Sequence, residues 1–408
     1  MKALVLAGGF PQIALICELK SRGYTVVLAD YFSNPVAKEY ADIFYQVSTL
    51  DVDAIKAVAK KEEVNFLITA CTDQALLTVA NVSEKLGLPC YIDYQTALNV
   101  TNKAYMKDVF EKNGISTAKH IVMAELEVDK LVDMEYPLIV KPVDCNSSKG
   151  VKRVENIEEL KEAFDDAVKL SRTNTAIIEK YVCGTEVSVD IYVEDGKAHI
   201  LSTSRLDKIG DKDKFVIFRG RFPALEAEPV MDKIQTTAQQ IADAFGLKNT
   251  PMLIQLITDG KDVYVLEFSA RTGGGIKYIL INNASGFNVI KAVVDLTEGK
   301  KPHVEKCVPK NKMMINSFVY CKNGKFHHLE GFDEMVEKGV MKEYYTFKWQ
   351  GAEFDGVGSS GDRVAGFLVV GDSYDEVAQK HKTVAENIKV IGYEGEDIMR
   401  HDLLADLD

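Results

Sequence analysis

The first part of the chain alternates short apolar runs with amphipathic stretches. The apolar runs fill residues 2–7, 25–29 and 64–70, and stretches with helical periodicity follow them at 12–22 and 74–87. Strands that alternate with helices are typical of a parallel sheet covered by helices on both faces. The pattern therefore predicts a Rossmann-like α/β domain over residues 1–95.

A glycine pair follows the first apolar run, as it does in dinucleotide-binding folds. Phe10 and Pro11 come directly after Gly8-Gly9, and no third glycine completes a G-x-G-x-x-G fingerprint. We therefore do not expect an NAD-dependent oxidoreductase. Asp30 ends the second apolar run, where it is better placed to cap a strand end or contact a substrate than to hold a ribose.

From about residue 96 the pattern changes to helices mixed with paired strands. One helix is expected to begin with Thr101 as its N-cap and to stop at Asn113-Gly114. Further helices are predicted at 155–171 and 228–246, and single strands at 136–142 and 175–182. Asp-Gly pairs at turn positions predict hairpins at 185–203 and 251–272. This middle part, residues 96–305, is predicted to be α+β.

Residues 306–408 form a smaller third part that also mixes helix and strand signals. Apolar positions around Asn323-Gly324 predict a hairpin over 316–331, and 363–390 is typical of a strand, a turn and a helix. His327 and His328 fall in the hairpin as neighbours. Neighbouring strand residues point to opposite faces, so we do not expect them to form a paired ligand set.

Composition narrows the class of protein. The chain has 408 residues and a net charge of −12, which disfavours binding to nucleic-acid phosphates. No apolar run approaches the roughly 18 residues of a membrane span, and Gly8-Gly9 interrupts the N-terminal run too early for a signal peptide. The seven cysteines are scattered without a C-x-x-C pair. That pattern indicates reduced thiols, so the expected location is cytoplasmic and no membrane partner is expected.

The most basic stretch, residues 204–222, lies between the two predicted hairpins. It permits two interpretations, a solvated loop or a lip that grips a carboxylate or phosphate of a substrate. Arg219 and Arg221 are two positions apart and would share one strand face. Arg363, in a turn before the last predicted strand, either reaches a substrate or forms a plain salt bridge in its turn.

Several positions suit the binding of a nucleotide triphosphate. Lys141 ends an apolar strand and is followed by the small polar loop 144–150, whose backbone N–H groups and hydroxyls can cover phosphates. The segment 179–182 ends another strand and can offer backbone groups to an adenine edge. Glu186 can accept hydrogen bonds from ribose hydroxyls. Each feature alone has a plain structural explanation, such as a charge at a sheet edge.

The hairpin 251–272 suits a magnesium ion and an acyl phosphate. Gln255 and Glu267 have the same strand-face parity and are expected to sit opposite each other, where their oxygens can bind Mg²⁺. Arg271 follows the acid and can hold a substrate carboxylate or the charge that develops on it. The glycines 273–275 allow close backbone approach. Separately, such residues are most often solvated acids and turns, so the joint order carries the argument.

That order resembles the ATP-grasp superfamily of ligases, over roughly the first 300 residues. The resemblance is greatest to amino-acid ligases and to stand-alone proteins like the large subunit of carbamoyl phosphate synthetase. It implies a Rossmann-like pre-domain, an ATP-grasp domain with a mobile lid at about 118–183, and a small α+β C-terminal domain. The fold class is thus a combination of α/β and α+β.

The resemblance also implies roles for individual residues. The catalytic residues would be Arg271 and Lys141. The ATP-binding residues would be Lys103, Lys141, Ser147, Ser148, Gly150, Glu179, Lys180, Tyr181, Val182 and Glu186. The ligands of one or two Mg²⁺ ions would be Gln255, Glu267 and Ser269.

Two positions depart from the superfamily's pattern. Gln255 stands where most members have an acid, although the carbamoyl phosphate synthetase large subunit resembles this chain there. Ser269 stands where E-x-N-x-R has asparagine, which puts the second Mg²⁺ in doubt. The latter departure leaves open an ATP-binding protein without turnover.

The activity implied by the resemblance is an ATP-dependent carboxylate–amine ligase that forms an acyl phosphate and releases ADP and phosphate. Its partners would be a small-molecule carboxylate, such as an amino acid, and an amine. A bicarbonate-dependent carboxylase or carbamoyl-phosphate-type enzyme and a phosphoribosylamine–glycine ligase remain alternatives. A homodimer also remains open by resemblance.

Overall fold

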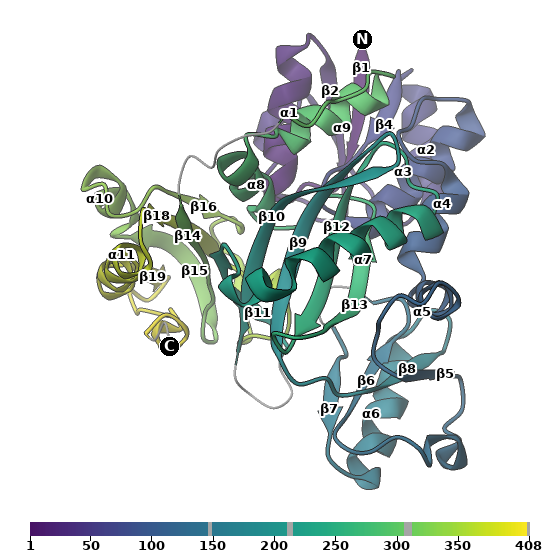
Figure 1. Cartoon of the computed structure of the whole chain (residues 1–408). Helices are drawn as coiled ribbons and strands as arrows, with labels where there is room; N and C mark the ends of the chain where they lie inside the picture. Colours follow the sequence, from purple (N-terminus) through teal and green to yellow (C-terminus); the bar gives the residue numbers. More distant parts are fainter. Residues whose placement is uncertain (146–148, 210–214, 306–311, 406–408) are drawn as a thin grey trace.

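The computed structural model describes residues 1–145, 149–209, 215–305 and 312–405. Figure 1 shows a large sheet in the centre, an N-terminal unit above it, a small sheet unit below it and the C-terminal region to one side. Ser147 and Ser148 lie outside the described residues. The mixed α/β and α+β class expected from the sequence is confirmed.

The N-terminal unit is a four-stranded parallel sheet with the order β3-β2-β1-β4. Its strands are β1 (Lys2–Leu6), β2 (Thr25–Asp30), β3 (Ile43–Gln46) and β4 (Phe66–Ile68). Its helices are α1 (Phe10–Ser21), α2 (Val52–Lys61) and α3 (Asp73–Leu86), with a 3₁₀ turn η1 (Lys38–Tyr40). Asp30 accepts hydrogen bonds from the Gly8 and Phe32 N–H groups, so it caps the strand end as expected.

Two helices lead out of this unit, α4 (Tyr94–Thr101) and α5 (Lys103–Lys112). The N-cap predicted at Thr101 is wrong, because Thr101 is the last residue of α4. Asn102 caps α5 instead, and its side chain accepts a hydrogen bond of 3.0 Å from the Tyr105 N–H. Asparagine is one of the strongest N-cap residues. The observed cap therefore lies one position after the predicted one, and the helix still ends at Lys112 as predicted.

The small sheet unit is antiparallel, with the order β5-β8-β6-β7. Its elements are β5 (His120–Met123), η2 (Val128–Leu131), β6 (Leu138–Pro142), β7 (Lys152–Val154), α6 (Ile157–Leu170) and β8 (Ala176–Lys180). Leu138, Val140 and Ile178 pack with α6 in one apolar cluster. Because strand side chains alternate, Lys141 and Glu179 point away from α6, toward the central sheet.

The central sheet has eight strands in the order β13-β12-β9-β10-β11-β14-β18-β16. They are β9 (Thr185–Glu194), β10 (Lys197–Lys208), β11 (Ile217–Phe222), β12 (Thr250–Thr258), β13 (Val263–Ser269), β14 (Met313–Val319), β16 (Glu343–Thr346) and β18 (Ala365–Gly371). The helices α7 (Met231–Ala244), α8 (Lys277–Ser285) and α9 (Val289–Thr297) complete this part, and a 3₁₀ segment η3 (Leu225–Val230) precedes α7. The helix predicted at 228–246 therefore begins later, at Met231.

The hairpin predicted around Asn323-Gly324 is wrong. β14 pairs with β11 and β18, whereas β15 (Gly324–Glu330) pairs with β17 (Glu353–Phe354) and β19 (Lys389–Gly392). Asn323-Gly324 lies between strands of two different sheets. The alternation of apolar residues does not specify with which strand β14 or β15 pairs. The remaining elements are α10 (Phe332–Glu337), η4 (Ser360–Asp362), α11 (Tyr374–Asn387) and η5 (His401–Leu403). The central sheet thus continues past the boundary predicted near residue 305, and the three domain ranges stay predictions.

The two adjacent histidines also differ from expectation. The register of β15 against β19 shifts between Phe326 and His328, which marks a bulge. The shift brings His327 and His328 together, with 2.7 Å between their Nδ1 atoms, so their rings do not point to opposite faces. Both rings are exposed, and no group of three or more potential His, Cys, Asp or Glu ligands occurs in the described ranges.

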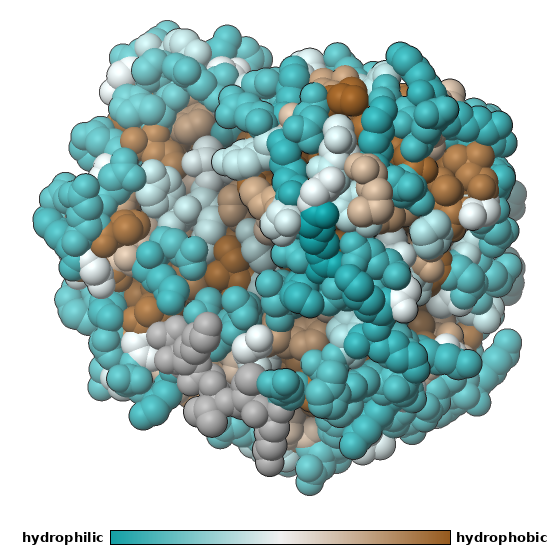
Figure 2. Space-filling model, turned by 90° about the horizontal axis from the view of Figure 1, so that it is seen from above, coloured by the Kyte–Doolittle hydropathy of each residue, from teal (hydrophilic) through white to brown (hydrophobic). Residues whose placement is uncertain are grey.

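The face shown in Figure 2 is mainly hydrophilic, and hydrophobic residues appear on it in separate patches. Within the part of the chain that the structure describes, no helix is long and apolar enough to cross a membrane.

Candidate functional site

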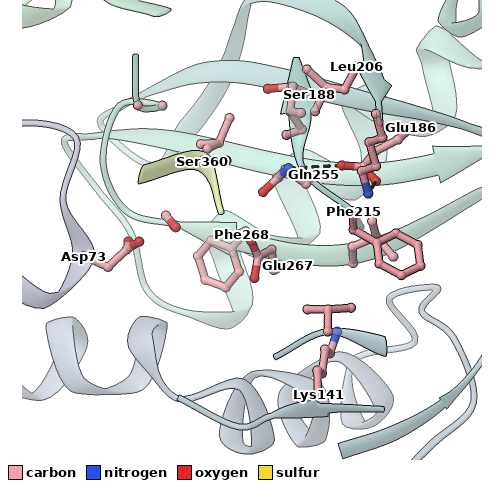
Figure 3. A pocket seen from close by; sticks show the side chains of 18 of the residues that line it. Asp73, Lys141, Glu186, Ser188, Leu206, Phe215, Gln255, Glu267, Phe268 and Ser360 are labelled. Carbon is pink, nitrogen blue, oxygen red and sulfur yellow. Dashed lines mark hydrogen bonds and ion pairs between the residues drawn. The ribbon is translucent and has the colours of Figure 1, made fainter. Parts of the chain in front are cut away.

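A cavity of about 320 Å³ lies where the small sheet unit, the N-terminal unit and the central sheet meet. In Figure 3, Lys141 points from below toward Glu267, Gln255 and Glu186, while Asp73 and Ser360 lie at the opposite end. The cavity is therefore elongated. We call the part near Glu186 and Lys141 the nucleotide end, and the part near Asp73 and Ser360 the substrate end.

Helix α5 supplies two lysines, Lys103 and Lys107, one turn apart on one helix face. Lys103 lines the cavity, and its Nζ donates to the Cys145 carbonyl at 2.7 Å and lies 3.4 Å from Glu267. Lys103 thus sits between the carboxylate expected to bind metal and the loop expected to cover phosphates.

Glu179 is the centre of a buried ion triad. Its two carboxylate oxygens lie 2.9 Å from the Lys107 Nζ and 2.7 Å from the Lys141 Nζ. Burial alone would raise the pKa of Glu179, but the two ammonium groups outweigh it and lower the pKa to about 2. The Glu179 side chain therefore orients Lys141. An adenine contact at this residue is left to its backbone, which is the kind of contact expected for the segment 179–182.

The rest of the segment expected to contact adenine also lines the nucleotide end. Lys180 ends β8, Tyr181 and Val182 follow it, and all three line the cavity. The Tyr181 N–H donates to the Pro137 carbonyl at 3.2 Å, and the Arg153 guanidinium lies 4.5 Å from the centre of the Tyr181 ring. The backbone and the ring of Tyr181 are thus both held in place where the chain leaves β8.

Glu186, the expected ribose acid, is nearly buried on β9 and lines the cavity. Lys208 forms an ion pair with it, and the Gln255 Nε2 donates to its Oε1 at 3.2 Å. An ionised acid at position 255 could not donate this hydrogen bond. The contact gives a physical reason for glutamine at position 255.

Gln255 and Glu267 are direct cross-strand partners in the β12–β13 pair, as expected from their parity. Glu267 is 38% exposed toward the cavity, and the Gln255 amide oxygen remains for a further ligand contact once its nitrogen is used. Carboxylate and amide oxygens match the preference of Mg²⁺, so the donor set fits one ion. Ser269 fits less well, since it contributes a hydrogen bond to Asp73.

Arg271 is already paired at the substrate end. Its Nε donates to the Asp73 Oδ1 at 2.7 Å, and its Nη2 contacts the Asp73 Oδ2. Burial would raise the pKa of Asp73, but the Arg271 guanidinium outweighs it and lowers the pKa. An arginine expected to hold a substrate oxyanion is therefore held in place by a carboxylate from the N-terminal unit.

The loop after Lys141 is described only at its edges. Lys149 and Val151 line the cavity, which agrees with a loop that borders the nucleotide end. Gly150 has φ +74°, and a Cβ there would lie 2.7 Å from the Leu170 Cδ1 and 3.0 Å from the Pro142 Cγ. Gly150 is thus needed for the turn and for close packing, and a direct phosphate contact by Gly150 stays a prediction.

Among the described residues of the basic stretch, the three arginines form neither of the two arrangements considered for it. Arg205, Arg219 and Arg221 all pair with Asp207 on the face of the central sheet turned away from the cavity. They lie in β10 and β11, so in the described part they belong to strands and not to a solvated loop or a substrate lip. Lys208, of opposite parity to Asp207, does line the cavity.

Several residues of the substrate end were not predicted from the sequence. Lys277, Ser204 and Asn316 line it, and the Lys277 Nζ lies 3.0 Å from Asp190 and 3.1 Å from the Ser204 Oγ. Asn316 is detectable from the sequence, because it and Ser317 are the two polar residues of the mainly apolar strand β14. Asp73 was also detectable, because it follows a parallel strand at the edge where such sheets bind ligands.

Arg363 lines the same end. No salt bridge of its side chain is found among the described residues, so the plain turn salt bridge considered for it is wrong. Its guanidinium lies 3.5 Å from the centre of the Phe318 ring.

Comparison with known proteins agrees with this geometry. The model of the ATP-grasp domain family matches residues 134–279. The large chain of carbamoyl phosphate synthase from Clostridium acetobutylicum is 23% identical over 292 residues, which cover 70% of this chain and 27% of that protein. This chain therefore spans only about a quarter of that relative.

Solved structures resemble nearly the whole chain. The L-amino acid ligase from Bacillus licheniformis has a TM-score of 0.78 at 20% identity, covering 96% of this chain and 98% of the ligase. The biotin carboxylase domain of a 2-oxoglutarate carboxylase from Hydrogenobacter thermophilus has a TM-score of 0.81 at 16% identity, covering 99% and 92%. At these identities the likeness shows the fold. Together with the match of the ATP-grasp domain family at residues 134–279, it confirms the expected resemblance of this chain to the ATP-grasp superfamily.

Proposed function

We propose that this protein is an ATP-dependent ligase that joins a small-molecule carboxylate to an amine and releases ADP and phosphate. One observation carries the proposal. One cavity is lined by two lysines, by a carboxylate–amide pair and by an arginine that Asp73 holds. These residues are Lys103, Lys141, Gln255, Glu267 and Arg271.

The charges at the nucleotide end suit a triphosphate. The side chains of Lys103 and Lys141 line the cavity and are already held by ion pairs, so little side-chain freedom is lost when a ligand binds. Glu267 and Gln255 would hold Mg²⁺, which supplies charge neutralisation between phosphate oxygens when bound. Lys180 to Val182 would border the adenine and Glu186 the ribose.

In the proposed reaction, the carboxylate attacks the terminal phosphoryl group of ATP and ADP leaves. The amine then attacks the acyl carbon, the phosphate leaves with the bonding electron pair, and the amine nitrogen loses its proton. Arg271 would stabilise the charge on the acyl phosphate oxygens. The residues' task is positioning and charge stabilisation, so no side-chain nucleophile is needed.

The test is a product assay with Mg·ATP, a pool of amino acids as carboxylates and amines, and separate quantification of ADP, AMP and phosphate. We expect ADP and phosphate in equal amounts. ADP release that needs bicarbonate and no amine would favour a carboxylase instead. Binding of Mg·ATP without any ADP release would favour the protein without turnover, for which the hydrogen bond from Ser269 to Asp73 is the motivating observation.

The alternative ligase activity expected from the resemblance is that of a phosphoribosylamine–glycine ligase. A second Mg²⁺, a homodimer and a cytoplasmic location stay predictions.

A further inference from the structure

We propose that the substrate end binds an amine that carries its own carboxylate, as a free amino acid does, with Arg363 holding the carboxylate and Asn316 accepting from the amino group. This inference rests on the proposed function and specifies its amine substrate. It also gives the C-terminal region a role, because both residues come from there.

Arg363 is fixed in the cavity wall without using all of its donors. Its Nε donates to the Tyr320 hydroxyl at 3.0 Å, and its Nη2 donates to the Ile217 carbonyl at 3.1 Å and the Ser360 Oγ at 3.3 Å. All three partners are uncharged oxygen atoms. Among the described residues, no carboxylate therefore forms an ion pair with the Arg363 guanidinium next to the cavity.

The remaining nitrogen of Arg363 faces a segment without side chains. A Cβ on Gly275, which has φ +66°, would lie 3.6 Å from the Arg363 Nη1 and 2.9 Å from the Phe318 ring. A side chain at position 275 would therefore clash with the Phe318 ring beside the guanidinium, and glycine avoids that clash. Arginine on an aromatic face, with a free edge, is well suited to bind a carboxylate.

Asn316 supplies the complementary acceptor. Its side chain is only 4% exposed and lines the cavity, and its Oδ1 has no hydrogen-bond partner among the described residues. Leaving a buried acceptor unpaired costs roughly 1–3 kcal/mol, so a ligand N–H at this position would recover that free energy. An amino group provides such a donor.

Small residues predominate around Asn316 on the cavity wall, and Leu206 is the larger residue among them. Asn316 is the cross-strand partner of Gly220, and Gly220 is the partner of Leu206, so the three share the cavity-facing side of the central sheet. Ser204 and Ser188 are partners on the same side. Small side chains here leave room above Asn316.

The order along the chain links this subsite to the reacting centre. Arg271, which would hold the acyl phosphate, is four residues before Gly275, which faces Arg363. Four residues span at most roughly 14 Å. The subsite between Asn316 and Arg363 therefore lies in the same end of the cavity as Arg271.

The experiment compares matched amines and two variants. Wild-type protein with Mg·ATP is assayed with alanine against ethylamine and glycine against methylamine, and Arg363→Gln and Asn316→Leu are measured with the same pairs. Arg400→Gln, a C-terminal arginine outside the cavity lining, serves as the control. Asn316→Asp keeps an acceptor and tests rescue.

We expect wild type to prefer each amino acid at least 10-fold over its decarboxylated partner, and Arg363→Gln to abolish that preference. Asn316→Leu should raise the KM for amino acids at least 10-fold and leave the KM for ATP within twofold, while Asn316→Asp should keep most of the affinity. Equal use of both members of each pair by wild type, or a matching rise in the KM for ATP, would overturn the inference.

Direct binding separates this inference from the proposed function. Amino acids should raise the Tm of wild type and of Arg400→Gln but not of Arg363→Gln. If this shift is seen while no ADP forms, the subsite stands and the ligase assignment fails. If ADP forms but the shift is equal in Arg363→Gln, the subsite assignment is wrong.

Discussion

Asp73 and Arg271 form an ion pair with two contacts, although they are 198 positions apart in the sequence. Asp73 is the first residue of α3 in the N-terminal unit, and Arg271 follows β13 of the central sheet. Both side chains are largely buried and both line the cavity. The N-terminal unit is therefore part of the candidate site and fixes the arginine that would face the acyl phosphate.

Removing one partner of this pair should be costly. Asp73→Asn leaves the Arg271 guanidinium buried without a counter-charge, and we expect a loss of about 3 kcal/mol in the free energy of unfolding. Arg271→Gln should cost a similar amount. The double variant should lose less than the sum, as measured by urea denaturation in a double-mutant cycle. Additive losses would contradict the pairing.

The Glu179 triad predicts a specific dependence of stability on pH. The pKa of Glu179 is about 2 in the folded protein, below its ordinary value of roughly 4.3. Its contribution is therefore present above pH 4.3 and is lost as the pH falls toward 2, and it amounts to about 3 kcal/mol. The difference in unfolding free energy between wild type and Glu179→Gln should shrink from pH 6 to pH 3.

Glu158 offers a matched control for that measurement, since it is an exposed acid on α6 of the same unit. Glu158→Gln should change stability by less than 0.5 kcal/mol, a typical limit for surface substitutions. A gap between wild type and Glu179→Gln that stays constant from pH 6 to pH 3 would contradict the ionised triad.

Glu267 is predicted to be the principal ligand of Mg²⁺. Glu267→Gln replaces a charged oxygen ligand by a neutral one, so the Mg²⁺ concentration for half-maximal ADP formation should rise at least 10-fold. The variant also leaves Lys103 without its carboxylate neighbour at 3.4 Å. A Mg²⁺ titration at saturating ATP is the measurement, and an unchanged titration would exclude Glu267 as the main ligand.

The sequence predicted those parts of the fold that depend on residues close together in the chain. The opposition of Gln255 and Glu267 was expected from strand parity and is confirmed, but a register shift between Gln255 and Leu256 produces it, because the pairs nearer the turn would place Gln255 opposite residue 266. The first sheet followed from its apolar runs in the same way. These features are determined by residues close together in the chain.

Long-range pairing was not predictable in this way. The apolar pattern of β14 fits a hairpin with β15 as well as it fits the observed pairs with β11 and β18. The contact between Asp73 and Arg271 joins two units whose relative placement no short segment specifies. The Glu179 side chain anchors Lys141 and also pairs with Lys107. No nucleotide motif singles out Lys107, so this triad was not predicted.

Lys141→Ala tests the central claim most directly, with ADP, AMP and phosphate measured in the presence of Mg·ATP and amino acids. Lys161→Ala, an exposed lysine on α6 of the same unit, is the control. We predict that wild type and Lys161→Ala release ADP and phosphate in equal amounts, and that Lys141→Ala loses at least 100-fold in kcat/KM for ATP. Release of AMP and pyrophosphate, or unchanged turnover in Lys141→Ala, would contradict the account.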